Sequence, residues 1–98
     1  DRTLPREAVL RSLSDLSPEL SGKYGVTRLG IFGSVAREEA SSASDVDIVV
    51  EMPPDLFKMV HMKEDLEEIL AAPVDLIRYS RFLNEILRSR IDHDAIYV

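Results

Sequence analysis

The chain has 98 residues, enough for one small domain (residues 1–98) and not for a catalytic domain with a separate substrate-reading domain. Apolar residues make up 45% and charged residues 31%, which is a globular mixture rather than a disordered one. Twelve Lys and Arg against eighteen Asp and Glu give a net charge of −6, the opposite sign to that of a protein that coats phosphate backbones. Direct nucleic-acid binding is therefore not expected.

The absence of cysteine excludes a disulfide framework, a thiolate metal site and a cysteine nucleophile. No apolar run approaches the ~18 residues of a membrane-spanning helix. No signal-peptide pattern opens the sequence. We therefore expect a cytoplasmic domain without a membrane contact.

The first predicted element is a helix over residues 4–21. Apolar residues recur there at intervals of three and four, which places them near one stripe of a helix. Gly22 suits the end of this helix, whereas Pro18 is able to end it early or to begin a second turn. A short strand over residues 26–32 follows and is bounded by glycines.

The middle of the chain predicts a short helix over residues 34–40, a polar loop over 41–44 and a second strand over 45–51. The second strand is rich in β-branched residues. Asp55 is a suitable N-cap for the next helix, which follows an apolar stripe and is closed by Pro73.

The last part of the chain predicts a strand over residues 74–77 and a helix that Ser80 caps and that runs to about residue 90. The residues of this helix that are predicted to face inward are Phe82, Leu83, Ile86 and Leu87. Residues 91–98 are compatible with a strand or with a turn. The alternation of helices and strands indicates a layered α/β or α+β domain. The full helix between the second and third strands predicts that they are parallel neighbours with a right-handed connection.

Polar and acidic residues gather at the ends of these strands. Gly33 and Ser34 follow the first strand, and Asp45 and Asp47 open the second. If these strands are neighbours, the two ends meet only in an antiparallel pair. Residues i and i+2 share a face of a strand, so Asp45 and Asp47 point the same way. Parallel pairing of the third strand with the second then brings Asp75 beside them, which predicts three carboxylates at one end of a mixed sheet.

This combination of residues indicates a metal and phosphate site. Three gathered carboxylates repel one another unless a cation lies between them, and Mg²⁺ prefers carboxylate oxygen while keeping positions open for substrate phosphates. Gly33 lets the backbone approach an anion, and Ser34 can donate a hydrogen bond to it. Phosphoryl or nucleotidyl transfer is the chemistry that fits. The sequence contains no Walker motif, no GxGxxG motif and no zinc-ligand spacing.

The segment Phe32-Gly33-Ser34, followed after ten residues by Asp45-Val46-Asp47, resembles the GS-x10-DxD signature of the DNA-polymerase-β-like nucleotidyltransferases. Residues 33–37, 44–50 and 73–77 are similar to the minimal nucleotidyltransferase (MNT) subfamily in particular. The resemblance covers most of the chain. It implies an α/β (α+β) fold with a small mixed sheet covered by helices, in which strands 1 and 2 are antiparallel and strands 2 and 3 parallel.

The resemblance also implies a metal-dependent mechanism. Asp45 and Asp47 would hold two Mg²⁺ ions that bridge the triphosphate of the donor. Asp75 would contact the metal that binds the acceptor hydroxyl and would help to deprotonate it. Gly33 and Ser34 would hold the β,γ-phosphates. In-line attack on the α-phosphorus would transfer the nucleotidyl group and release pyrophosphate.

Arg37 matches an arginine of the family, and the resemblance implies that it steadies phosphate charge. Pairing with a neighbouring glutamate on the surface explains Arg37 almost as well. The family often has glycine after this arginine, where this chain has Glu38. A carboxylate at that position would alter the loop or repel the triphosphate.

The function implied by the resemblance is a protein adenylyltransferase that uses Mg²⁺ and ATP to place AMP on a hydroxyl acceptor. The acceptor would be a tyrosine of a HEPN-family toxin, so that the chain acts as the antitoxin of a prokaryotic toxin–antitoxin system. The alternative is an antitoxin that acts by binding alone and keeps a vestigial nucleotidyltransferase site. Glu38 and the acidic charge favour that alternative. Modification of a small molecule such as an aminoglycoside fits less well, because such enzymes generally carry a further substrate domain.

Two groups of residues near the end of the chain have compositions that are compatible with further functional roles. Residues 92–94 (Asp-His-Asp) have the composition of a metal or general-base site, although a solvated turn is the better interpretation. A basic cluster in the otherwise acidic chain consists of Arg78, Arg81, Arg88 and Arg90. A solvated helix face is its simplest interpretation, with a phosphate-facing role or a docking surface as the alternative.

Overall fold

The computed structural model describes residues 5–39 and 45–98. Helices and strands follow one another in the order α1 (Arg6–Tyr24), β1 (Arg28–Phe32), α2 (Gly33–Ala36), β2 (Val46–Glu51), α3 (Leu56–Leu70), β3 (Val74–Arg78), α4 (Glu85–Asp94) and β4 (Ile96–Tyr97). The polar loop predicted over residues 41–44, and the last residue of the short helix predicted before it, lie outside the described residues. No helix in the described parts of the chain is both long enough and apolar enough to cross a bilayer.

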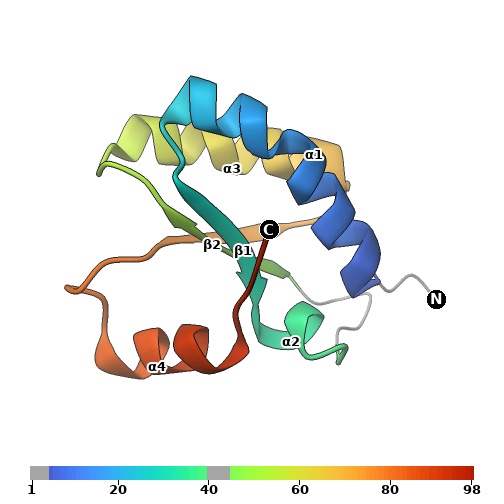
Figure 1. Ribbon diagram of the computed structural model, residues 1–98, viewed down its shortest axis with the longest axis vertical. Helices are drawn as coiled ribbons and strands as arrows, with labels where there is room; N and C mark the ends of the chain where they lie inside the picture. The colour runs from blue at the N-terminus through green and yellow to red at the C-terminus, as the bar shows by residue number, and fades with distance from the viewer. Residues whose placement is uncertain (1–4, 40–44) are drawn as a thin grey trace.

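The strands form one mixed sheet in the order β3-β2-β1-β4 (Figure 1). β1 runs antiparallel to β2 and to β4, and β2 runs parallel to β3. The predicted antiparallel and parallel pairings are therefore both confirmed. The helix that separates β2 from β3 provides the crossover that a parallel pair requires.

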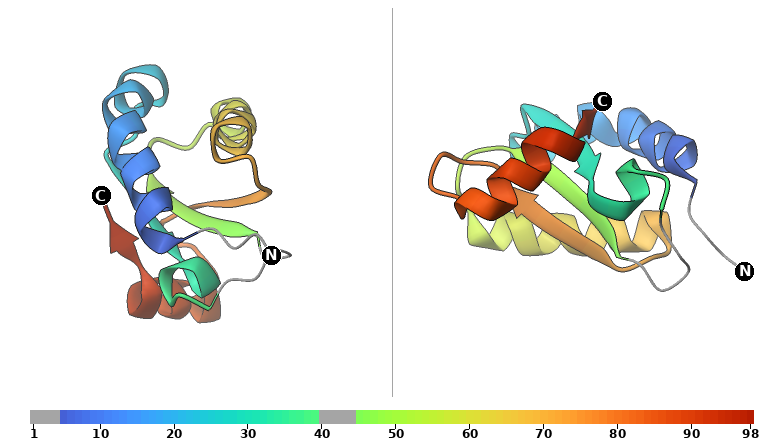
Figure 2. Two further views of the ribbon diagram at one scale, coloured as in Figure 1. Left: turned by 90° about the vertical axis from the view of Figure 1, so that its right-hand side faces the viewer. Right: turned by 90° about the horizontal axis from the view of Figure 1, so that it is seen from below.

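The sheet separates two layers of unlike helices. Helices α1 and α3 lie side by side on one face, while α2 and α4 lie on the other (Figure 2). The larger core lies between the sheet and the α1–α3 pair and includes Leu13, Ile31, Ile48 and Leu66, none of which is exposed. Each such side chain contributes about 1.5–3 kcal/mol by leaving water. The smaller core lies under α4 and is centred on Phe32, Val49 and Ile91.

Helix α1 continues past Pro18 to Tyr24, and the prediction that the helix ends at residue 21 beside Gly22 is wrong. Residues Leu20 and Tyr24, beyond the proline, are 3% and 4% exposed, so their packing on the core offsets the hydrogen bond that proline cannot donate. The helix ends instead at Gly25, whose left-handed backbone (φ 72°) allows its N–H to donate to the Ser21 carbonyl at 3.0 Å.

Helix α3 begins as predicted, because the Asp55 side chain caps it. The carboxylate accepts a hydrogen bond from the Lys58 backbone N–H at 3.1 Å. Its buried stripe consists of Met62, Leu66 and Leu70. The stripe packs α3 against α1 and the sheet. The prediction that Leu56, Val60 and Ile69 belong to this apolar stripe is wrong, since they are 76%, 50% and 50% exposed.

Helix α4 begins four residues later than predicted, at Glu85. Asn84 caps it, since its side-chain oxygen accepts hydrogen bonds from the backbone N–H groups of Ile86 and Leu87 at 2.9 and 3.3 Å. Ser80 caps only a local turn, where its hydroxyl accepts from the Phe82 N–H at 3.2 Å. Asn84, and not Ser80, is therefore the residue that caps α4 and sets where the helix begins.

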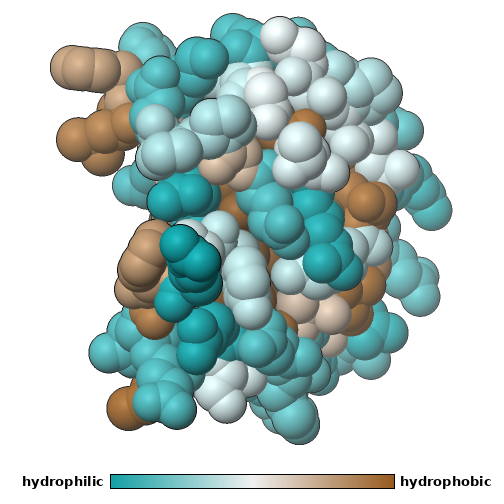
Figure 3. Space-filling view, turned by 60° about the vertical axis from the view of Figure 1, so that its left-hand side comes forward, coloured by the Kyte–Doolittle hydropathy of each residue, from teal (hydrophilic) through white to brown (hydrophobic). Residues whose placement is uncertain are grey.

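The later start changes which side of α4 faces the sheet. Leu83 and Leu87 pack on the smaller core as predicted, but Phe82 and Ile86 are 81% and 74% exposed. The expectation that Phe82 and Ile86 face inward is wrong. Figure 3 shows exposed apolar side chains on this side of the molecule as separate patches divided by polar ones.

The end of the chain is a helix turn followed by a strand. Helix α4 continues to Asp94, and its Ile91 is completely buried. β4 then pairs with β1, and Gly30 makes this approach possible, because an added Cβ would lie 2.6 Å from the Ile96 carbonyl oxygen. Of the outcomes left open for residues 91–98, the strand is confirmed only for Ile96–Tyr97, whereas residues 91–94 continue helix α4 and neither outcome applies to them.

Candidate active site

The acidic residues lie where β2 and β3 begin and β1 ends. Asp47 pairs with Asp75 in the parallel register of β2 and β3, and it pairs with Phe32 in the antiparallel register of β1 and β2. Asp45 immediately precedes β2 and is exposed. The structure therefore confirms the predicted positions of these carboxylates, together with Gly33 and Ser34, at one end of the sheet.

The carboxylates share the face of the sheet that α4 covers. Along β2, Val46, Ile48 and Val50 belong to the core under α1 and α3, whereas Val49 belongs to the core under α4. Side chains alternate between the faces of a strand, so Asp47 lies on the α4 side with Val49. Asp75 does the same in β3, because Ile77 packs on the core under α4. The α4 face is thus apolar at its centre and acidic at one end.

Gly33 closes the site against Asp47. Its backbone is left-handed (φ 72°), and an added Cβ would collide with the Asp47 carboxylate. Glycine is therefore required at this position for its conformation and for the space that it leaves. Ser34 is the next residue of α2 and is half-buried. The Gly33-Ser34 pair lies directly beside Asp47, as the sequence motif predicts.

The surroundings of Asp47 disfavour its charge. Burial raises the pKa of Asp47, and the negative charges of Asp75 and Asp45 raise it further, while Arg90 and Arg37 act in the opposite direction. A cation placed between Asp47 and Asp75 would relieve both effects. The oxygen ligands of this pair are those that Mg²⁺ prefers.

A complete metal-ligand set is not preformed. Within residues 5–39 and 45–98, no three His, Asp or Glu side chains converge closely enough to hold a metal ion. Asp47 and Asp75 pair in register, and Asp45 and Asp75 are both exposed whereas Asp47 is half-buried. The ligand roles of Asp45, Asp47 and Asp75 remain predictions that the chemistry of these oxygen donors supports.

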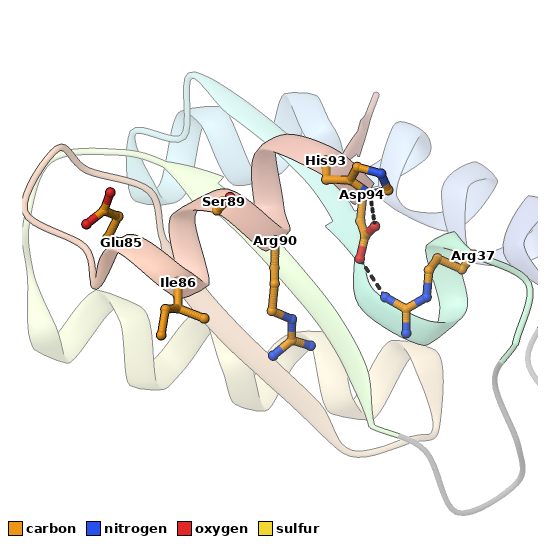
Figure 4. A pocket seen from close by; sticks show the side chains of 7 residues that line it. All are labelled: Arg37, Glu85, Ile86, Ser89, Arg90, His93 and Asp94. Carbon is orange, nitrogen blue, oxygen red and sulfur yellow. Dashed lines mark hydrogen bonds and ion pairs between the residues drawn. The ribbon is translucent and has the colours of Figure 1, made fainter.

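An open cleft of about 690 Å³ lies between the end of α2 and helix α4 (Figure 4). The residues that line it are Arg37, Glu85, Ile86, Ser89, Arg90, His93 and Asp94. Arg37 directly follows α2, which begins at Gly33, and Ile91 beside Arg90 packs with Phe32, the β1 partner of Asp47, so the cleft adjoins the acidic end of the sheet. The cleft therefore extends the candidate site from the sheet onto α4.

Arg37 is engaged by two carboxylates. Its Nε donates to Glu39 at 2.8 Å, and its Nη1 donates to Asp94 at 2.6 Å (Figure 4). The Asp94 side chain is only 6% exposed, and its hydrogen bond with His93, followed by that with Arg37, lowers the pKa of Asp94. The pairing with a neighbouring glutamate is thus present, and a pair with α4 accompanies it. The contact of Arg37 with phosphate remains a prediction.

Glu38 occupies a backbone conformation that suits glycine. Its φ is 60°, in the left-handed region, and its carboxylate lies 3.3 Å from the Arg6 guanidinium of α1. Arg6 also donates to the Ala36 carbonyl at 3.1 Å. The glycine found here in the resembling family fits this geometry. Glu38 does not line the cleft, so in this structure its charge is directed to α1.

The sequence leaves a phosphate-facing role for the basic cluster open, but it does not indicate that α4 lines the site. The turn predicted for residues 92–94 is the last turn of this helix, where Asp92 accepts a hydrogen bond from the Tyr79 hydroxyl at 2.8 Å. The basic cluster does not act as one group, since Arg88 donates to the Arg81 carbonyl and Arg78 to the Met52 carbonyl, whereas Arg90 enters the cleft. A helix extended to residue 94 would have revealed the common side of Ile86, Arg90 and His93 by its spacing.

Comparisons with known proteins agree with this geometry. A family model described as a nucleotidyltransferase domain matches residues 13–97. The protein adenylyltransferase MntA of Thermococcus cleftensis is 35% identical over 97 residues, covering 97% of each chain. A solved structure of a candidate minimal nucleotidyltransferase superposes with a TM-score of 0.76 at 32% identity and covers 98% of both chains. The MNT antitoxin from a complex with a tri-AMPylated HEPN toxin of Shewanella oneidensis shares the fold, with a TM-score of 0.68 at 18% identity over 94% of this chain and 70% of that one.

The mixed sheet, its acidic end and the matching family model define a transferase of the nucleotidyltransferase-domain family, to which the chain belongs. Within that family it is a minimal nucleotidyltransferase, since the similarity to MntA and to the solved minimal enzyme extends over almost the whole chain.

Proposed function

We propose that this minimal nucleotidyltransferase transfers AMP from ATP to a hydroxyl group of a HEPN-family toxin and thereby acts as its antitoxin. One observation carries the proposal. Asp47 and Asp75 stand in register beside the backbone of Gly33, at the acidic end of an otherwise apolar sheet face. The name of the Thermococcus relative and the AMPylated toxin in the Shewanella complex support adenylyl transfer to a protein of this class.

Asp47 and Asp75, with Asp45 at the exposed edge, are the residues that would hold Mg²⁺. When bound there, Mg²⁺ would neutralise charge on the donor phosphates. Gly33 lets the phosphates approach the backbone, and the Ser34 hydroxyl can donate a hydrogen bond to them. Asp47 is half-buried, and its partial burial strengthens its interaction with a bound cation.

Asp75 is the residue that would take the proton from the acceptor. Its carboxylate accepts the hydroxyl proton while the acceptor oxygen attacks the α-phosphorus and the bond to the β,γ-pyrophosphate breaks. The products are an AMP ester on the acceptor and pyrophosphate. We propose a tyrosine as the acceptor residue. Its phenolic oxygen gives up its proton as it attacks, so the protons of this step balance.

Inhibition of the toxin by binding alone is a second candidate function. The engagement of Arg37 by Glu39 and Asp94 favours it, because an arginine held in this way is less available to a nucleotide. Under this alternative the carboxylates of the sheet have no role in neutralising the toxin. The two functions therefore differ in what removal of those carboxylates does.

The test is transfer of label from α-labelled ATP, with Mg²⁺, to the product of the gene adjacent to that of this chain, which we propose to be a HEPN-family toxin. We expect the wild type to label the toxin and Asp47→Asn to leave it unlabelled. Asp15→Asn is the matched control, because Asp15 is an exposed aspartate of α1 on the other face of the sheet. Neutralisation of the toxin by Asp47→Asn as complete as that by the wild type would establish the binding-only function instead.

A further inference from the structure

The two arginines of the cleft differ in the partners that they already have. Arg37 is held by Glu39 and Asp94, so that two carboxylates share its charge. Arg90 is exposed and, within residues 5–39 and 45–98, takes part in no hydrogen bond or ion pair. An incoming anion would have to compete with two carboxylates for Arg37, whereas Arg90 has no such carboxylate partner in the part of the chain that the structure describes.

Helix α4 holds Arg90 at the cleft by its packing on the sheet. Leu83, Leu87 and Ile91 are anchored in the smaller core, and Ile91 is fully buried. Arg90 immediately precedes this anchor, and with Ile86 it forms an (i, i+4) pair on the side that lines the cleft. Figure 4 shows Arg90 extending from the middle of α4, with the Arg90 and Arg37 guanidinium groups on the same side of the helix.

Arg90 lies next to the acidic end of the sheet. Ile91, the following residue, packs with Phe32 in the smaller core, and Phe32 pairs with Asp47 in the register of β1 and β2. Arg37, which lines the cleft together with Arg90, directly follows helix α2, which begins at Gly33. The phosphates of a donor bound beside the carboxylates would therefore lie next to this cleft, where a cation offsets their charge.

We propose that Arg90 is the principal cationic side chain that binds the phosphates of the nucleotide donor, and that Arg37 mainly ties the end of α2 to α4. This inference rests on the proposed function, because it names the donor contact of that same site. A guanidinium presents a planar fork of N–H donors that matches two phosphate oxygens. Arg90 would therefore contribute mainly to the affinity for the donor.

The test is the affinity of the folded protein for α,β-methylene ATP with Mg²⁺, measured by isothermal titration calorimetry. This analogue binds without being transferred, so the measurement does not depend on an acceptor. We expect Arg90→Gln to weaken binding about 10- to 100-fold, which is the range for loss of a hydrogen bond to a charged group. Arg90→Lys keeps the charge without the fork and should lie between Arg90→Gln and the wild type.

Arg88→Gln is the matched control. Arg88 lies on the same helix, does not line the cleft and donates to the Arg81 carbonyl at 3.0 Å. We expect it to leave the affinity within about twofold of the wild type, and we expect Arg37→Gln to weaken binding less than Arg90→Gln does. Melting curves of all variants show whether a change in affinity reflects unfolding.

The outcomes separate this inference from the proposed function. If the wild type binds the analogue and Arg90→Gln binds equally well, the role of Arg90 is refuted while nucleotide transfer stands. If the wild type binds, Arg90→Gln does not, and no label is transferred from ATP, the phosphate contact is supported and the transfer is refuted. If the wild type fails to bind the analogue with Mg²⁺, both are refuted.

Discussion

The two faces of the sheet are made from the same strands and are used in different ways. The face under α1 and α3 is apolar along its whole length, with Val46, Ile48 and Val50 of β2 all fully buried. The face under α4 is apolar only at its centre, around Val49, and ends in the paired carboxylates of Asp47 and Asp75.

This difference shows how a small domain can hold an unfavourable site. Asp47 placed beside Asp75 on the α4 face destabilises the fold, because its burial and the like charge of Asp75 both raise the pKa of Asp47 and oppose its ionisation. The continuous core on the opposite face supplies the stability that the α4 face lacks. Changes to the two faces should therefore separate activity from stability.

The largest expected effect is on activity, at the acidic end of the α4 face. Asp47→Asn should reduce AMP transfer about 10³-fold, because loss of a metal-holding carboxylate removes several kcal/mol of transition-state stabilisation. Kinetics with labelled ATP measure this loss.

The same variant should melt at a higher temperature than the wild type at neutral pH. The pKa of Asp47 is raised in the folded state, so its contribution to stability is present below its unfolded pKa and is lost as the pH rises through the folded pKa. Asparagine has no charge to bury, so the difference in Tm between Asp47→Asn and the wild type should vanish in acid, where Asp47 is also uncharged. A lower Tm for Asp47→Asn than for the wild type at neutral pH would contradict the conclusion that the charge of Asp47 destabilises the fold.

The next largest effect is on stability, at the α1–α3 face. Leu66→Ala should lower the free energy of unfolding by about 2–5 kcal/mol, since Leu66 is fully buried in the larger core. Urea denaturation measures this change. The transfer rate per folded molecule should stay close to that of the wild type, and a specific loss of activity without a loss of stability would break the separation of the two faces.

A smaller effect is expected where the backbone meets Asp47. Gly33→Ala should destabilise the fold by about 1–2 kcal/mol through its left-handed backbone alone, and it should also displace the Asp47 carboxylate and reduce transfer. Gly22→Ala is the contrasting change, because an added Cβ meets nothing within 4 Å and the residue lies inside α1. It should stabilise the protein by about 0.5–1 kcal/mol, as thermal melts would show.

The smallest effect is expected in the polar link between α1 and α3. Asp65 accepts hydrogen bonds from the Tyr24 hydroxyl at 2.5 Å and from Lys23 at 3.0 Å, and these two partners lower the pKa of Asp65. Its stabilising effect is therefore present above the unfolded value of 3.8 and is lost as the pH falls through the folded pKa. Asp65→Asn should lower the Tm by a few degrees at neutral pH and by nothing in strong acid. An equal loss at both pH values would contradict an ionic origin.

The sequence predicts the β1–β2–β3 part of the sheet and its acidic end well, because alternation along a strand is a local property and the crossover helix requires β2 and β3 to be parallel. The spacing of Gly33, Asp45 and Asp47 and the crossover helix before Asp75 are enough to bring these residues together. Helix α4 is harder to predict, since two competing caps, Ser80 and Asn84, precede it and its inward side depends on which of them is used.

For the same reason, the sequence does not predict which side chains of α4 face the site. The roles of Arg90 and Asp94 depend on the rotation of α4 about its axis, which packing of Leu87 and Ile91 decides. The engagement of Arg37 likewise depends on a residue 57 positions further along the chain. Such contacts are properties of the tertiary structure rather than of a motif.

The most direct test of the division between the two faces is the position of a bound metal ion. Mn²⁺ can replace Mg²⁺ at carboxylate ligands and broadens the NMR signals of nearby backbone amides. With Mn²⁺ and α,β-methylene ATP, we predict selective broadening at Gly33, Asp47, Asp75 and Arg90, while the amides around Asp65 between α1 and α3 stay sharp. Broadening centred on Asp65, or spread evenly over both faces, would contradict the account.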